Sequence, residues 1–208
     1  MDRIVVGISG SSSPVYGVRL LEVLRLRGQE ELHLILSRSA HHTLRHELPE
    51  WSLEKVEALA HVCHSPENLA APVASGSYLT RAMVVAPCSM RSLAGIAHSL
   101  SDNLLLRAAD VHLKERRPLI LVPRETPLHL GHLRNMVSAT EMGAVVLPPM
   151  AAFYHRPRTV MDVVDHTVGK ILDQLGIPHD LFQRWGTTSE GGAWPSPRPP
   201  CSASPEAS

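Results

Sequence analysis

Hydroxyl side chains are concentrated in one short turn near the N-terminus, directly after an apolar segment. The stretch Arg3–Gly17 reads RIVVGISGSSSPVYG, so an apolar strand leads through Gly10-Ser11-Ser12-Ser13 into a helix. Free amides and the helix dipole favour an anion at a helix N-terminus. We therefore predict a phosphate-binding turn at Gly10, Ser11 and Ser12. The alternative interpretation is that these serines only cap the helix.

The turn lacks the spacing of a dinucleotide-binding loop, because the GxGxxG pattern is absent and Gly10 is the only glycine in the loop. A dinucleotide site also places an acidic residue after the second strand, where it holds the ribose hydroxyls. Here the second apolar segment, Glu31–Ser37, ends in a serine. A hydroxyl suits a phosphate ester better than a diol, so the pattern favours a mononucleotide such as FMN over NAD.

More polar side chains follow the later apolar segments. These are Ser89, Met90, Arg91 and Ser92, then Arg124, and then Tyr154 and His155. Ligands bind at the carboxyl ends of strands in an open parallel sheet. We therefore expect two serine-lined helix starts and Arg124 to converge on one anionic ligand. The alternative is that each serine is an ordinary helix cap.

Short apolar segments alternate with helical ones along the chain. Strands are expected from Arg3 and at Glu31–Ser37, Ala82–Pro87, Pro118–Pro123 and Ala144–Leu147. Helices are expected after Gly10 and at Arg38–Glu47, Ser52–His61, Ser89–His98, Asp102–Arg116, His129–Met142 and Thr159–Leu175, with a loop at Glu67–Ser77. Buried strands separated by helices predict an α/β fold: a single-domain, doubly wound, Rossmann-like parallel sheet with helices on both faces.

Composition limits the class of protein. The 208 residues are 44% hydrophobic, enough for one domain with a full core, and 20 basic residues balance 20 acidic ones. This balance gives no indication of a nucleic-acid or membrane-surface partner. No apolar run reaches the roughly 20 residues of a membrane span and no signal-peptide pattern is present, so we expect a cytoplasmic protein. The Pro/Ser/Gly-rich segment Thr187–Ser208 is expected to be a disordered tail, which leaves one domain at residues 1–186.

Cysteine and histidine spacing gives no metal site. Three cysteines form no CxxC pair, which indicates a reducing compartment. Histidines at 61 and 64, and at 129 and 132, have i,i+3 spacing without a third ligand in an evident pattern. We predict no metal.

Several longer motifs carry a resemblance to a known family. They are GISGSSSPVYGVRLL, ASGS at 74–77, PCS at 87–89, RAADVHLKERRPLILVPRETPLH at 107–129, GAVVLPPMAAFYHRP at 143–157 and DLFQRW at 180–185. In this order, over Met1–Gly186, they resemble the UbiX-type flavin prenyltransferases, whose flavoprotein fold is shared with phosphopantothenoylcysteine decarboxylase. The resemblance implies a metal-independent transfer of a dimethylallyl group from dimethylallyl phosphate to N5 and C6 of reduced FMN. It also implies a homo-oligomer, generally a dodecamer, with shared active sites, whose product serves a UbiD-type decarboxylase.

The resemblance also implies roles for individual residues. FMN is expected against Gly10, Ser11, Ser12, Ser37, Ser89, Met90, Arg91, Ser92 and Arg124. The donor phosphate is expected against Lys114, Arg124, Tyr154 and Lys170, some of them supplied by a neighbouring subunit. Glu47 is expected near flavin N5 to handle its proton, and Glu125 near the phosphate and the arginine. With Ser12 and Lys114, these two acids form the expected catalytic set.

The chain departs from the family pattern at four positions. Ser13 replaces a flexible glycine, Pro14 begins the following helix, Leu69 stands where some members have tryptophan, and Lys170 stands where many have arginine. Lysine keeps the charge and loses the bidentate fork. Two other functions stay open on sequence grounds. One is a flavin-dependent cysteine decarboxylase, although its PxMNxxMW stretch is replaced here by LPPMAAFYH. The other is a non-catalytic FMN-binding partner of a decarboxylase.

Overall fold

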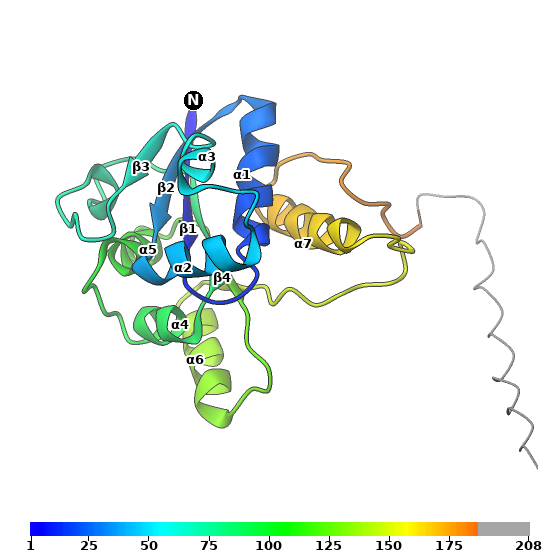
Figure 1. Cartoon of the computed structure of the whole chain (residues 1–208). Helices are drawn as coiled ribbons and strands as arrows, with labels where there is room; N and C mark the ends of the chain where they lie inside the picture. The colour runs from blue at the N-terminus through cyan, green and yellow to red at the C-terminus, as the bar shows by residue number, and fades with distance from the viewer. Residues whose placement is uncertain (187–208) are drawn as a thin grey trace, which may run out of the picture.

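The computed structural model describes residues 1–186, and the expected tail at 187–208 lies outside them. Six parallel strands form one sheet in the order β3-β2-β1-β4-β5-β6. The strands are β1 Asp2–Ile8, β2 Glu30–Leu36, β3 Val62–His64, β4 Ala82–Cys88, β5 Leu119–Pro123 and β6 Val145–Val146. Because all six run the same way, their carboxyl ends share one edge, the lower end of the sheet in Figure 1.

Helices cover both faces of the sheet, which confirms the predicted doubly wound α/β fold. They are α1 Val15–Arg27, α2 Arg38–Glu47, α3 Leu53–Glu57, α4 Met90–Ala97, α5 Leu104–Lys114, α6 Leu130–Glu141 and α7 Val160–Gln174, with a short 3-10 helix, η1, at Pro72–Ala74. Alternate residues of β1 divide the core: Ile4 and Val6 pack with α1, α2, α3 and α7, and Val5 packs with α4, α5 and α6. No helix within residues 1–186 is long and apolar enough to cross a membrane.

The structure corrects three local predictions. The helix expected at Ser52–His61 ends at Glu57, and the chain then forms the edge strand β3, which the sequence did not predict. Helix α5 is capped by Asn103, whose side chain accepts the amide hydrogen of Leu106, and not by Asp102. The predicted loop before β4 contains η1. Strand β3 and helix η1 are too short to show a hydrophobic period, and Asp102 and Asn103 are both residue types that cap helices.

The strand order places a crevice beside β1. From β1 the chain proceeds to β2 on one side, whereas β4 pairs with β1 on the other side. The loops that leave β1 and β4 therefore diverge toward opposite faces of the sheet. In such sheets ligands bind outside the carboxyl ends of the strands at the point of reversal.

Candidate active site

Hydrogen bonds tie together the loops that follow β1, β2 and β4. The Ser9 side chain, 1% exposed, donates its hydroxyl hydrogen to the Pro87 carbonyl over 2.8 Å and accepts the Ser89 amide over 2.7 Å. The Ser37 amide donates to the Ile8 carbonyl at 3.0 Å. The three loops are thereby held as one rigid edge.

Two helices begin at this edge with a serine cap. Ser37 accepts the Ala40 amide of α2 at 3.2 Å, and Ser89 accepts the Ser92 amide of α4, also at 3.2 Å. In both helices the two amides before the capped one have no hydrogen-bond partner within residues 1–186. These free amides, together with the two helix dipoles, provide sites for an anion. The capping interpretation is therefore correct for these two serines, and it leaves the anion-binding amides in place.

A cavity of about 310 Å³ lies between the two helix starts. Its polar wall consists of Gly10, Ser37, Ser39, Ser89, Arg91 and Ser92, and side chains around the start of α5 line the rest. A Cβ on Gly10 would lie 2.2 Å from the Ser39 Cβ, so only glycine allows the loop after β1 to approach α2 so closely. The structure thus brings together five of the predicted FMN residues.

The serine turn after β1 has unused hydrogen-bonding capacity. The Ser11 hydroxyl is buried and has no partner within residues 1–186. Helix α1 is preceded by Pro14, and no side chain caps it, so the turn serines do not serve as its caps. A buried hydroxyl without a partner costs about 1–3 kcal/mol, which a ligand oxygen can offset. The donor set of hydroxyls, free amides and Arg91 fits the phosphate ester of FMN.

Glu47 reaches this turn from the end of α2. Its Oε2 accepts the Ser13 amide over 2.7 Å. Ser13 has a φ of 74°, the left-handed conformation that favours glycine, so this hydrogen bond supports a strained position. Glu47 therefore lies at the serine turn, although 34 residues separate it from Ser13 in the chain.

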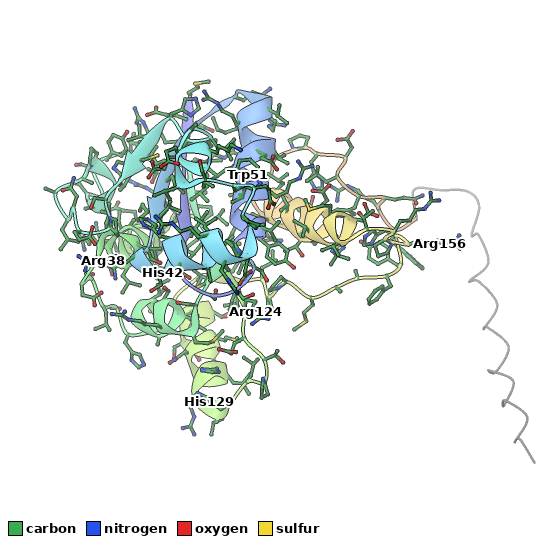
Figure 2. All side chains as sticks on the ribbon, in the orientation of Figure 1. Arg38, His42, Trp51, Arg124, His129 and Arg156 are labelled. Atoms are coloured by element: carbon green, nitrogen blue, oxygen red, sulfur yellow. The ribbon has the colours of Figure 1, made fainter. Side chains whose placement is uncertain are left out.

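Arg124 supplies a cation at the same edge. Its amide donates to the Cys88 carbonyl at 3.3 Å, and its guanidinium has no hydrogen bond or ion pair to another group in the described part of the chain. Burial raises the pKa of Tyr16 on α1, while a Thr167 hydrogen bond and the Arg124 charge oppose the rise. Figure 2 shows Arg124 at the lower end of the sheet, the end to which the strand arrows point in Figure 1. A free cation there suits a phosphate.

Helix α7 carries Lys170 and meets Tyr154. The Tyr154 hydroxyl lies 3.1 Å from His166 Nε2, one turn before Lys170. Lys170 pairs with Asp173 at 3.3 Å. The pKa of Asp173 is lowered to about 2, mainly because Arg184 donates hydrogen bonds to its carboxylate. Desolvation opposes this shift, and a hydrogen bond from Lys170 adds to it. Since Arg184 neutralises Asp173, the Lys170 charge stays available to an incoming anion.

Three predicted site residues differ from expectation within the single chain: Lys114 lies at the other edge of the sheet, and the side chains of Glu125 and Met90 make other contacts. Lys114 ends α5 just before β5, so it lies at the amino edge of the sheet, where it pairs with Glu115. At about 3.3 Å per residue, β5 separates the two edges by roughly 15 Å. Glu125 accepts the Thr126 amide at 3.0 Å and forms no ion pair with Arg124. The Met90 side chain packs against the core, so α4 offers its amide at this position.

A larger cavity, about 640 Å³, lies beside β3. Two of its charged side chains, Arg38 and Glu67, pair with each other at 2.5 Å. Its lining includes neither of the capping serines Ser37 and Ser89 and no glycine turn. We therefore assign the FMN site to the smaller cavity, which has all three. Within residues 1–186 no group of three or more His, Cys, Asp or Glu side chains is placed to hold a metal ion.

Comparison with known proteins gives the family. The Flavoprotein family model matches residues 1–173. The flavin prenyltransferase UbiX of Salmonella typhimurium is 56% identical over 187 residues, which cover 89% of this chain and 98% of that protein. The chain belongs to the UbiX-type flavin prenyltransferase family.

Solved UbiX-type structures share the fold closely. A dodecameric FMN-dependent Ubix-like decarboxylase from Escherichia coli O157:H7 matches with a TM-score of 0.86 and 46% identity, over 88% of this chain and 98% of that one. AnUbiX in complex with FMN and dimethylallyl pyrophosphate matches with a TM-score of 0.86 and 42% identity, over 93% and 98% of the two chains.

Two residues of this UbiX-type site escaped prediction. Ser9 was not assigned a role, although it follows the last apolar residue of β1 and precedes the glycine turn. His166 is separated by 12 residues from Tyr154 and lies in a helix predicted only as amphipathic. Its position on α7, one turn before Lys170, was the signal that could have found it.

Proposed function

We propose that this chain is a flavin prenyltransferase that transfers the dimethylallyl group of dimethylallyl phosphate to N5 and C6 of reduced FMN. The observation that carries the proposal is the carboxyl edge of the sheet. There, among the residues that the structure describes, a buried Ser11 hydroxyl without a partner lies on a glycine turn next to two helix starts with unpaired amides, and Arg124 adds an unpaired cation. The UbiX-type relatives support the same activity.

The serine edge holds the FMN phosphate in this proposal. Gly10 allows close approach, the hydroxyls of Ser11 and Ser12 donate to phosphate oxygens, and Ser37 and Ser89 orient the α2 and α4 amides. Reduced FMN supplies N5 and C6 as the nucleophilic atoms when bound. Glu47, fixed against the Ser13 amide, would take the proton that N5 loses as its new bond to carbon forms, and would pass that proton to the prenyl double bond. The released phosphate would accept the proton that C6 loses when the second bond forms.

The cationic side holds the phosphate of the prenyl donor. As the bond from carbon to phosphate oxygen breaks, negative charge grows on the leaving phosphate, and Arg124 and Lys170 stabilise that charge. Tyr154 adds a hydroxyl donor. The dimethylallyl carbocation character of the transition state requires that water be excluded, so the site must be covered during the reaction.

A second copy of the chain completes the donor side. Lys114 lies at the opposite edge of the sheet in one chain, so it reaches a donor phosphate only from a neighbouring subunit. We therefore propose a homo-oligomer with shared active sites, a dodecamer like the relative from Escherichia coli O157:H7. Co-assembly of Lys114→Ala and Glu47→Gln chains tests this: each alone is slow, and the mixed oligomer regains activity if Lys114 acts across the interface. No recovery in verified mixed oligomers would show that Lys114 does not act across the interface.

Two further parts of the proposal concern the cell. The product, prenylated FMN, serves a UbiD-type decarboxylase as its cofactor. Because the acceptor is reduced FMN, which oxygen oxidises, we place the reaction in the reducing cytoplasm. To test the partner, the reaction product is added to a UbiD-type apoenzyme, and we expect decarboxylase activity to appear.

The decisive experiment is anaerobic incubation of the chain with reduced FMN and dimethylallyl phosphate. We expect the flavin mass to rise by one prenyl group with a changed absorption spectrum, and chelator treatment to leave this conversion intact. Bound FMN of unchanged mass would favour the non-catalytic carrier instead. Loss of conversion on chelation that added metal restores would overturn metal independence.

A further inference from the structure

The hydroxyl of Tyr154 is hydrogen-bonded inside a cluster of aromatic side chains on α7 and the C-terminal segment. Tyr154 is 42% exposed, whereas His166 is 8% exposed, and the Tyr154 ring meets the His166 ring edge-on at 5.6 Å. The hydroxyl oxygen lies 3.1 Å from His166 Nε2. The tyrosine side chain is therefore partly exposed to solvent, and its hydroxyl is held by a buried histidine.

Neighbouring rings fix the plane of the His166 imidazole. His155 stacks on it with centroids 4.9 Å apart and planes within 6°, and Phe182 contacts it at 4.6 Å. Both His155 ring nitrogens are buried without a hydrogen-bond partner within residues 1–186, so His155 contributes its flat face. A ring held in this way cannot turn its Nε2 away from Tyr154.

Burial, aided by neighbouring positive charge, favours the neutral form of the His166 imidazole. Burial lowers the His166 pKa, and His155 and Lys170 lower it further, while Asp173 opposes them. A neutral imidazole carries one hydrogen, on Nδ1 or on Nε2. The tautomer therefore decides whether Nε2 donates to Tyr154 or accepts from it.

The direction of this hydrogen bond follows from the donor phosphate that the proposed function places beside Tyr154. A hydroxyl-to-phosphate hydrogen bond is charge-assisted and is stronger than one between neutral groups. With a phosphate bound, the single tyrosine proton points to the phosphate, and the tyrosine oxygen then needs a donor behind it. His166 in the Nε2–H form is the donor within reach.

We propose that His166 is a positioning residue that donates Nε2–H to the Tyr154 oxygen and so directs the tyrosine hydroxyl toward the phosphate of the prenyl donor. The role rests on the proposed function, because it deepens the description of that donor site. It predicts that His166 acts only through the Tyr154 hydroxyl.

A double-mutant cycle tests this role. The chains compared are wild type, Tyr154→Phe, His166→Leu and the double variant, each loaded with oxidised FMN so that no turnover occurs. Calorimetry measures the affinity for dimethylallyl phosphate. We expect each single variant to bind it about 10-fold more weakly, the loss of roughly one hydrogen bond, and the double variant to bind no more weakly than Tyr154→Phe.

Two further variants separate a positioning role from a structural one. His166→Gln places an amide donor near the Nε2 position and should restore the affinity to within about 3-fold of wild type. His98→Leu removes an exposed histidine at the end of α4 and should leave the affinity for dimethylallyl phosphate equal to that of wild type. FMN affinity should be equal in all chains, and the KM for the donor should rise with a smaller change in kcat.

The outcomes separate the two proposals. Additive losses in the cycle, or a Gln variant as weak as Leu, would overturn the role of His166. Because the binding cycle needs no turnover, a wild-type chain that binds dimethylallyl phosphate but never prenylates FMN would overturn the proposed function alone. Non-additive losses rescued by glutamine would establish the positioning role.

Discussion

His112 at the amino edge of the sheet and the Ser11 hydroxyl at the carboxyl edge are both buried, but their polar atoms are paired differently. At the amino edge, His112 is fully buried and both of its ring nitrogens are bonded, Nε2 to the Thr80 hydroxyl at 2.9 Å and Nδ1 to the Ala108 carbonyl at 2.7 Å. At the carboxyl edge, the buried Ser11 hydroxyl has no partner within residues 1–186, and Ser13 has a left-handed φ.

The difference shows where the chain has kept capacity for a ligand. A polar group paired inside the protein stabilises the fold, whereas a buried unpaired hydroxyl beside a strained turn marks a place where a bound ligand can offset the cost. Substitutions at the amino edge should therefore change stability, and substitutions at the carboxyl edge should change binding and turnover.

Glu47→Gln should give the largest effect at the carboxyl edge. We expect prenylation to slow by about 10²–10³-fold, because the amide cannot exchange a proton. The amide oxygen can still accept the Ser13 amide, so the affinities for FMN and dimethylallyl phosphate should stay near those of wild type. Single-turnover kinetics with separate binding measurements check this. Full turnover in the variant would remove Glu47 from the proton transfer.

Lys170→Ala should lower only the affinity for the prenyl donor, dimethylallyl phosphate. Loss of one charge-assisted hydrogen bond should weaken dimethylallyl phosphate by about 10- to 150-fold, equivalent to roughly 1.5–3 kcal/mol, with FMN affinity unchanged. Arg184 continues to neutralise Asp173, so the variant should fold. Lys170→Arg is the matched control and should retain activity. Weakened FMN binding in Lys170→Ala would show that the two halves of the site are not separate.

His112 should make stability, but not turnover, depend on pH. Burial lowers its pKa from 6.5 to about 4 in the folded protein. As the pH falls below 6.5, the unfolded chain gains a proton before the folded one does, so this contribution to stability is complete above pH 6.5 and declines toward pH 4. Between pH 7 and pH 5 the loss should be about 2 kcal/mol.

Urea unfolding at the two pH values measures the loss of stability. His112→Gln should show a smaller fall between pH 7 and pH 5, whatever its absolute stability. An equal fall in the variant and in wild type would assign the pH dependence to other groups.

Ser13→Gly should give the smallest effect, and a favourable one. Glycine adopts a φ of 74° without strain, so we expect the free energy of unfolding to rise by about 0.5–1 kcal/mol, net of the greater entropy of the unfolded chain. Ser12→Gly, at a neighbouring position without a positive φ, should lower stability instead. Thermal unfolding of both variants decides whether the turn stores strain at Ser13 specifically.

The sequence predicted the fold class and most elements, because long apolar segments and serine caps mark strands and helix starts directly. The segment β3 was missed because three residues at a sheet edge carry no periodic pattern, and its pairing with β2 depends on distant residues. Asn103 could not be separated from Asp102 as the cap, since both residue types cap helices well.

The hydroxyl half of the site was predictable for the same reason as the fold, since Gly10, Ser37 and Ser89 each follow an apolar strand. Contacts between distant segments were not. The bond from Ser9 to Pro87 spans 78 residues, and the pairing of Tyr154 with His166 depends on how the segment before α7 folds back. The edge on which Lys114 lies does follow from its place between α5 and β5, and its distance from Arg124 could have been inferred.

The Ser9 hydroxyl, bonded at once to the Pro87 carbonyl and the Ser89 amide, has a kinetic consequence. These two hydrogen bonds hold the proposed phosphate-binding loops in place before FMN binds. In the proposed reaction the flavin changes only at its ring, which is distant from the phosphate. The phosphate-binding loops then bind FMN and its prenylated product with nearly equal affinity. Such uniform binding lowers the concentration of FMN that is needed, but it does not accelerate the chemical step. Prenylation at the ring therefore does not by itself expel the finished flavin from its phosphate site.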